Sequence, residues 1–175
     1  MALQRLNEAS MHPKPTQHNS QSAHMMHTNA QLQILNETPF DRYERTVLHI
    51  SRLFFLSFHL PQTGAWVNAF QFAQDEFAAP FGPSIAKAVL DVITVTRTLR
   101  GSGFEYCDPR CHECCAFITK EERYLISSLH YTRRHERQKA RMQSMMLCEG
   151  AEDSSFFNKI SQLSHISDAP EFDIH

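Results

Sequence analysis

Residues 38–61 read TPFDRYERTVLHISRLFFLSFHLP, and this stretch decides the fold class. Its first residues predict a helix with Thr38 as N-cap, Pro39 at the first position and Asp41 at the third. Pro61 ends the helix. Large apolar residues recur between them every three or four positions, as on one buried helix face. They are Phe40, Tyr43, Val47, Ile50, Phe54 and Phe58.

Two more segments show the same helical spacing. Residues 64–77 read GAWVNAFQFAQDEF, with Trp66 on the expected apolar face. A third helix is expected from Pro83 or Ser84 to Arg100; its β-branched part could form a strand, but its polar residues do not alternate as a strand requires. With only 5 glycines and 8 prolines, a turn-rich β-sandwich is disfavoured.

The second half of the chain begins with a cysteine-rich loop at residues 104–118 and then returns to helix. Thr119 and Glu122 form a capping box, which predicts a helix start. A polar stretch follows, and apolar residues resume before Cys148. The fold expected from the whole pattern is all-α, a small bundle of four or five helices.

Composition sets the domain limits. Residues 1–37 form a polar leader and are expected to be disordered. Residues 38–150 form the helical domain. Residues 151–175 form an acidic and largely disordered tail, with one weak amphipathic piece at residues 156–163.

Charge and hydropathy bear on the environment. The formal net charge is −2, so no global field favours a polyanionic partner. The most apolar stretch, residues 46–60, contains Arg52 and is shorter than the ~20 residues that span a bilayer. We therefore expect a cytoplasmic protein without a membrane partner, where clustered cysteines serve as metal ligands or redox thiols rather than structural disulfides.

The cysteine-rich loop contains the densest chemical signal. Residues 107–115 read CDPRCHECC and hold four of the five cysteines. The C-x2-C spacing lets one tight turn aim two thiolates at one ion, which predicts a closed structural zinc site. The predicted ligands are Cys107, Cys111, Cys114 and Cys148, with Cys115 and His112 as alternates.

This ligand set requires the chain to reverse. A straight helix over residues 120–147 would be about 42 Å long at 1.5 Å per residue, which would carry Cys148 away from the loop. The reversal, a helical hairpin, is expected in the polar stretch at residues 131–136, although no glycine or proline marks it.

Cys107, Cys111 and Cys114 also stand at C-x3-C-x2-C, a spacing that resembles the cluster-binding triplet of radical SAM enzymes. The resemblance implies an iron–sulfur cluster as the alternative cofactor. It does not extend to the enzymes' α/β barrel, because no strand–helix alternation follows. Free redox thiols are a further alternative.

A basic segment follows the loop. Residues 131–148 carry five Arg or Lys against one Glu, a net charge of +4. Such a helix could contact nucleic-acid phosphates, although a solvated face is the simpler interpretation. The candidate contacts are Arg133, Arg134, Arg137, Lys139 and Arg141.

No nucleophile elbow or phosphate-binding glycine loop is present in the sequence. The leading expectation is therefore a non-enzymatic regulatory or adaptor protein with a protein partner and a structural zinc. A nucleic-acid-binding regulator and a thiol redox or iron–sulfur sensor are the two alternatives.

Overall fold

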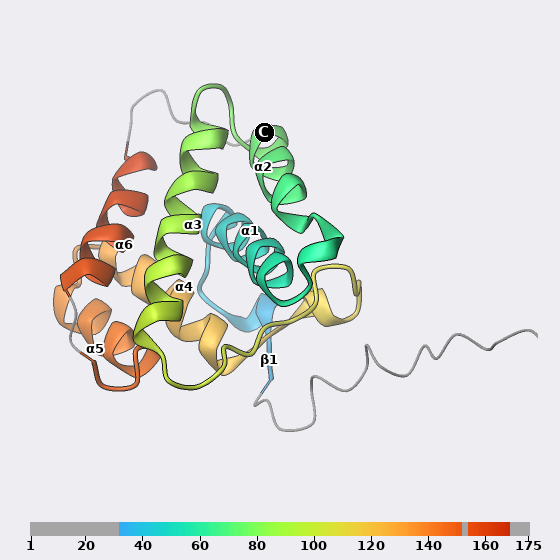
Figure 1. Ribbon diagram of the computed structural model, residues 1–175. Helices are drawn as coiled ribbons and strands as arrows, with labels where there is room; N and C mark the ends of the chain where they lie inside the picture. The colour runs from blue at the N-terminus through green and yellow to red at the C-terminus, as the bar shows by residue number, and fades with distance from the viewer. Residues whose placement is uncertain (1–31, 152–153, 169–175) are drawn as a thin grey trace, which may run out of the picture.

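The structure, a computed structural model, describes residues 32–151 and 154–168. Over these residues it contains six α-helices and one short antiparallel ribbon (Figure 1). The helices are α1 (Arg42–His59), α2 (Ala65–Glu76), α3 (Phe81–Leu99), α4 (Lys120–Arg133), α5 (Arg137–Leu147) and α6 (Ser154–Ile166). The prediction of a predominantly helical fold is confirmed, with one helix more than the four or five expected.

The remaining elements are short. Strands β1 (Gln33–Ile34) and β2 (Phe117–Ile118) pair antiparallel, with Ile34 opposite Phe117. The described residues also form three 3-10 turns, η2 (Leu35–Glu37), η3 (Pro61–Thr63) and η4 (Cys114–Ala116). Strand β1 and turn η2 occupy residues 33–37, so the ordered part of the chain begins earlier than the predicted boundary at residue 38. Residues 1–31 of the predicted leader lie outside the described residues.

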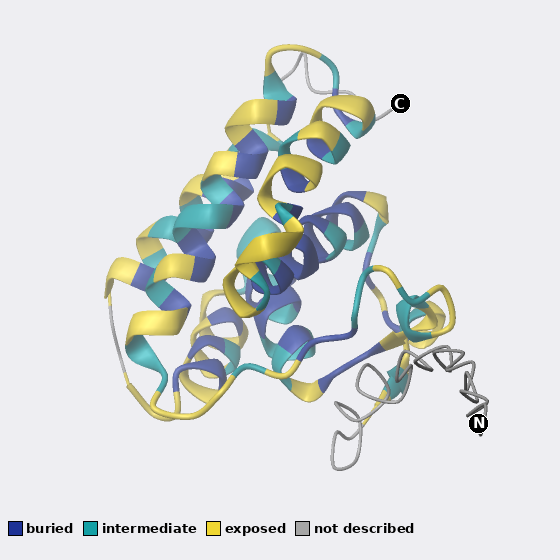
Figure 2. Ribbon diagram, turned by 45° about the vertical axis from the view of Figure 1, so that its right-hand side comes forward, coloured by how far each residue is buried: buried dark blue, intermediate teal, exposed yellow. Residues whose placement is uncertain are grey.

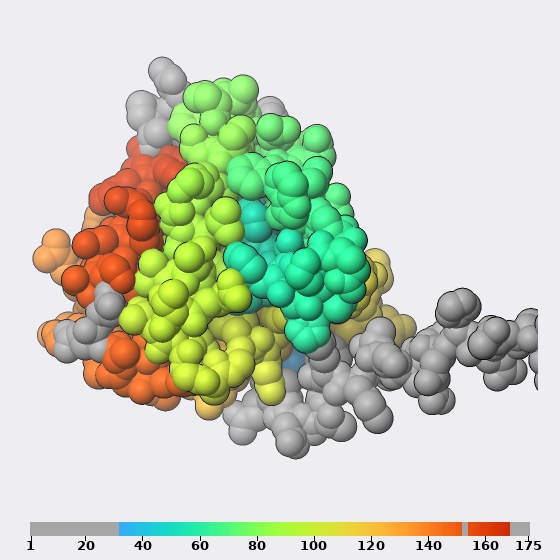
Figure 3. All heavy atoms as spheres, in the orientation of Figure 1, coloured from blue at the N-terminus to red at the C-terminus, as the bar shows by residue number. Residues whose placement is uncertain are grey.

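Helix α1 is the centre of the core. It packs against α2, α3 and α4, while α6 lies against α3 and α4. Buried positions line the inner faces of the helices (Figure 2), and in the space-filling view α2 and α3 cover most of α1 (Figure 3). Burial reaches most of the circumference of α1, because it has neighbours on several sides.

The start of α1 differs from the prediction. Asp41, not Thr38, is the N-cap, and Glu44 completes the capping box. The Thr38 hydroxyl instead donates to the Leu35 carbonyl oxygen and closes η2. Trp66 on α2 is also placed differently from the expected core position, because it is 55% exposed. Small residues form the buried face of α2; they are Ala65, Ala69 and Ala73.

The chain reverses between α4 and α5, as the hairpin prediction requires. His135 adopts a left-handed conformation with φ of 58°. The Glu136 N–H donates to the Tyr131 carbonyl oxygen across the turn. Glycine usually occupies a left-handed position at a helix end, whereas this chain has histidine there. The sequence therefore lacks the glycine that would have indicated the turn.

Helix α6 corrects the prediction of a largely disordered acidic tail. The amphipathic piece at residues 156–163 belongs to this helix and buries Phe156, Ile160 and Leu163. The Tyr43 hydroxyl donates to the Leu163 carbonyl oxygen at 2.9 Å, which joins α6 to α1. Residues 152–153 and 169–175 lie outside the described part of the chain. Among the described helices none has the length and apolar content to cross a membrane.

Candidate functional site

The cysteine-rich loop connects α3 to α4 and is anchored near both ends. The Cys107 N–H donates to Glu122 Oε1 at 3.0 Å. At the other end, Arg52 Nη2 donates to the Phe117 carbonyl oxygen at 2.6 Å. The Thr119 hydroxyl also donates to the Glu105 carbonyl oxygen at 2.8 Å, so the two ends of the loop are tied to each other. The tip between the anchors, residues 108–116, is exposed or half-buried.

Both anchors depend on one buried ion pair. Arg52 and Glu122 side chains are 2% and 1% exposed. They form a bidentate pair, with Nε to Oε1 at 2.7 Å and Nη2 to Oε2 at 2.9 Å. Burial opposes the charge on Arg52, but the hydrogen bonds and charge of Glu122 outweigh it and raise the Arg52 pKa. Glu122 is also the capping-box glutamate of α4, accepting from the Thr119 N–H at 2.9 Å.

Cys111 and Cys114 are joined by a disulfide at the exposed tip, with Cα atoms 5.2 Å apart. The Cys114 N–H donates to Cys111 Sγ at 3.2 Å. Cys115 keeps a half-buried thiol, whose Sγ lies 3.6 Å from the Pro109 carbonyl oxygen. The nine-residue cluster therefore contains both oxidised and reduced sulfur.

Cys107 differs from the other cysteines of the loop because it is fully buried. Burial, followed by the negative charge of Glu122, raises the pKa of the Cys107 thiol to about 12. A thiol with this pKa stays protonated at neutral pH and is a poor nucleophile. Cys107 is thus a packed anchor residue rather than a reactive one.

The structure does not bring the four predicted zinc ligands together. Cys148 is the C-cap of α5. Helix α5 lies on the left of Figure 1, and the yellow part of the cysteine-rich loop lies on the right. Within residues 32–151 and 154–168, no group of three or more His, Cys, Asp or Glu side chains is placed to hold a metal ion. The zinc site of Cys107, Cys111, Cys114 and Cys148 stays a prediction, as does the iron–sulfur alternative.

The basic residues predicted as nucleic-acid contacts divide into groups. Arg133 Nη1 binds Glu44 Oε1 at 2.8 Å and Asp41 Oδ2 at 2.6 Å, and Arg134 Nη1 binds the same Glu44 oxygen at 2.9 Å. These arginines therefore tie α4 to α1. Lys139 pairs with Glu136 at the start of α5. The remaining two, Arg137 and Arg141, line a cavity between α5 and α6.

Sequence reasoning missed the ion pairs that two buried glutamates, Glu44 and Glu122, form with arginines. The available signal was Arg52, a charged residue inside the most apolar stretch of the chain. Because α1 is buried on several sides, such a residue needs a counter-charge, but spacing along the chain does not identify Glu122, which is 70 positions away.

An exposed apolar patch adjoins the loop. Ile34 and Phe117 are directly opposite across the ribbon, so their side chains share one face. Leu32 precedes strand β1 and is also exposed. Leu32, Ile34 and Phe117 are 40%, 44% and 36% exposed. We call these three residues the ribbon patch. Turn η4, which starts at Cys114, leads directly into Phe117 and contacts η2, which follows β1.

No family model matches the chain, and neither a curated protein nor a solved structure matches it.

Proposed function

We propose that this chain is a non-enzymatic regulatory protein in which the Cys111–Cys114 pair acts as a thiol switch for protein binding at the ribbon patch. One observation carries the proposal. The half-buried disulfide lies at the tip of a loop, between two hydrogen-bonded anchors, and η4 links it directly to Phe117. Closing or opening the disulfide changes the conformational freedom of the segment that presents Phe117.

The switch requires only thiol–disulfide exchange with a low-molecular-weight disulfide. One thiolate of the Cys111–Cys114 dithiol attacks a sulfur of that disulfide, forms a mixed disulfide and releases one small thiolate. The second cysteine then attacks the mixed disulfide, closes the protein disulfide and releases the second small thiol. Two electrons and two protons pass to the small disulfide, which is reduced to two thiols.

The surroundings confine this chemistry to the tip. Cys107 stays protonated because its pKa is raised to about 12, so it does not compete for the mixed disulfide. The hydrogen bonds of Glu122 to Cys107 and of Arg52 to Phe117 hold the loop ends whichever state the tip is in. The switch is therefore local, and the helical core supplies a fixed frame.

The test is amide hydrogen exchange on the full chain, oxidised and reduced, in glutathione buffers of defined ratio. Reduction is expected to speed exchange at residues 110–118 and at the paired residues 33–34, while α1 is unchanged. Cys111→Ser should reproduce the reduced pattern in both buffers. Cys148→Ser, which removes a cysteine outside the loop, should respond to reduction like the natural sequence. Equal exchange of the ribbon residues in both buffers would reject the proposal.

A structural metal in the reduced loop is the second candidate. It is favoured by the Cys114 N–H that donates to Cys111 Sγ of the disulfide, since the same hydrogen bond, kept after reduction, would stabilise a thiolate that binds metal. Cys107 and Cys148 would complete the predicted set, with Cys115 and His112 as alternates.

Elemental analysis of protein purified under reductant decides this candidate. One zinc per chain would support it, and visible absorption with bound iron would support the iron–sulfur version. Loss of the metal in Cys148→Ser would support the predicted ligand set, whereas loss in Cys115→Ser and retention in Cys148→Ser would replace it by the alternate. Protein without zinc or iron, before and after zinc addition, would exclude both metals.

A further inference from the structure

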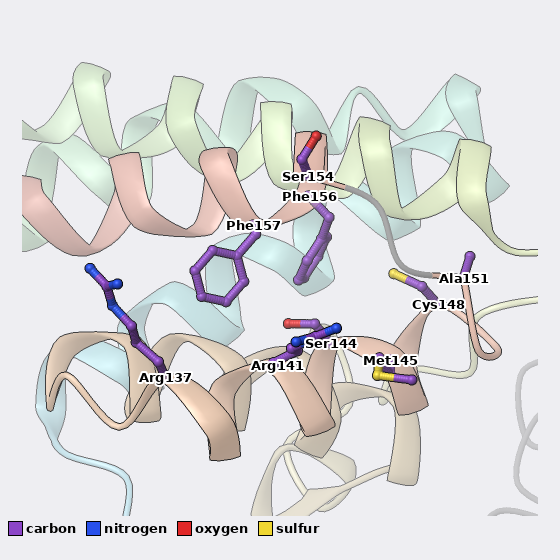
Figure 4. Close-up of a pocket in the computed structure, with 9 residues that line it drawn as sticks. All are labelled: Arg137, Arg141, Ser144, Met145, Cys148, Ala151, Ser154, Phe156 and Phe157. Atoms are coloured by element: carbon purple, nitrogen blue, oxygen red, sulfur yellow. The ribbon is translucent and has the colours of Figure 1, made fainter.

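A cavity of about 520 Å³ lies between α5 and α6, outside the cysteine loop. The close-up shows Phe156 and Phe157 reaching down from α6 and a row of side chains along α5 facing them (Figure 4). The volume falls in the range of about 300–1,000 Å³ that is typical of small-molecule sites in proteins. Phe156 lines the cavity from α6 and is 1% exposed, so the wall that it contributes is continuous with the hydrophobic core.

The cavity wall on α5 is polar at one end and apolar at the other. Arg137 and Arg141 are one helical turn apart, and Met145 and Cys148 continue the same row toward the C-terminal end of α5. In the close-up, Arg137 stands at the end away from Cys148, with the Phe157 ring between them (Figure 4). A ligand lying in the cavity would therefore meet a guanidinium group at one end and apolar side chains along its length.

Arg137 carries the positive charge that is available at the polar end of the cavity. This arginine is exposed and forms no ion pair with any residue in the described ranges. Its guanidinium is a planar donor group that binds a carboxylate or sulfonate through two parallel hydrogen bonds.

We propose that this cavity binds a small amphipathic anion, namely a carboxylate or sulfonate on a medium-length alkyl or aromatic body. The acid group contacts Arg137, and the apolar body lies against Phe157 and Met145 toward Cys148. Charge complementarity selects the anion, and the size and apolar lining of the cavity select a small apolar body. This site is independent of the proposed thiol switch, because none of the loop cysteines lines it.

The experiment uses the full chain and two probes. Binding of 1-anilinonaphthalene-8-sulfonate is followed by fluorescence, and decanoate is then titrated as a competitor, with decanol as the uncharged competitor of equal chain length. Decanoate is expected to displace the probe about tenfold more tightly than decanol, because a charge-assisted hydrogen bond to arginine is lost with the alcohol. Equal competition by the two would overturn the proposal.

Two matched pairs of variants place the site. Arg137→Gln should weaken decanoate about tenfold, and Arg42→Gln, an exposed arginine on α1, should leave it unchanged. Phe157→Ala should weaken both competitors, and Met142→Ala, an exposed residue of α5 outside the cavity lining, should weaken neither. Unchanged binding in both Arg137→Gln and Phe157→Ala would overturn the assignment.

A further pair of conditions separates this site from the thiol switch. Decanoate affinity is expected to be equal with and without reductant. Binding of an acidic amphipathic peptide in place of decanoate, with no decanoate competition, would assign the surface to a protein and reject the small-molecule site.

Discussion

The buried carboxylate of Glu122 connects the core, the start of α4 and the cysteine loop, and its neutralisation is therefore the most informative perturbation. Glu122 accepts four hydrogen bonds, two from Arg52, one from the Cys107 N–H and one from the Thr119 N–H. Glu122→Gln keeps the size and shape of the side chain. It removes the negative charge and replaces one acceptor oxygen by an NH₂ donor.

Either orientation of the new amide is unfavourable. Oε1 of Glu122 faces Arg52 Nε and the Cys107 N–H, and Oε2 faces Arg52 Nη2 and the Thr119 N–H. The NH₂ group therefore meets two donors whichever way the amide is turned, and Arg52 is left buried without a counter-charge. Removing one partner of a buried ion pair costs about 3–5 kcal/mol, so we expect a loss of this size in the free energy of unfolding.

Urea denaturation followed by helicity measures this loss, with an unchanged slope as the condition for comparing midpoints. Glu76→Gln is the matched control, because its pair with Arg42 is 3.5 Å long and exposed; its cost should stay below about 1 kcal/mol. Alkylation of Cys107 is a second readout, and it should accelerate in Glu122→Gln because the loop loses its anchor. A loss below about 1 kcal/mol together with unchanged Cys107 alkylation would refute the reasoning.

The other predictions concern the packing of α2, the loss of stability at low pH and an exposed tryptophan. Gly82→Ala should destabilise the protein by about 1–3 kcal/mol in urea, because the added Cβ would lie 2.6 Å from a carbonyl oxygen of α2, whereas Gly103→Ala, with open space around it, should be neutral. Burial raises the pKa of Asp41, but hydrogen bonds from the Glu44 N–H and from a guanidinium outweigh it and set the pKa below 3.8. The stabilisation from Asp41 is thus present above pH 3.8 and is lost as the pH falls through the lowered pKa. The difference in urea midpoint between the natural sequence and Asp41→Asn should therefore become smaller in acid. A difference that does not change with pH would contradict this. Trp66→Ser should change the unfolding free energy by less than about 0.5 kcal/mol, against about 3–5 kcal/mol for Phe77→Ala, which is buried; a large loss for the tryptophan would show that it packs in the core.

The helices could be predicted from the sequence because local rules and tertiary packing agree there. The apolar spacing of α1 predicts a buried face, and the Thr119–Glu122 capping box places the start of α4. The predicted start of α1 was wrong because two possible capping boxes overlap in the residues that precede the helix. Thr38 with Asp41 and Asp41 with Glu44 both have capping-box spacing, and glutamate, with the longer side chain, forms the box that the structure contains.

The cysteine chemistry could not be predicted to the same depth. A C-x2-C spacing places two sulfurs in one turn, and the structure joins Cys111 to Cys114. The same spacing serves a disulfide and a metal knuckle, so local sequence does not choose between them. The position of Cys148 depends on the hairpin between α4 and α5, and the surroundings of its side chain depend on the packing of α6. The acidic composition of the tail does not predict this helix.

The two capping glutamates explain why α1 and α4 could not be understood separately. Each lies at the N-terminus of its own helix and binds basic residues of the other: Glu44 binds Arg133 and Arg134 at the end of α4, and Glu122 binds Arg52 in α1. The side chain of a capping-box glutamate already accepts a hydrogen bond from the backbone N–H of the N-cap residue. It therefore loses less conformational freedom when it forms an ion pair. Exchanging the partners for neutral residues at one end therefore weakens a helix start and a helix–helix contact together. The cysteine loop leaves the core at one of these two points, and that is the physical reason its ends stay fixed while its tip is exposed.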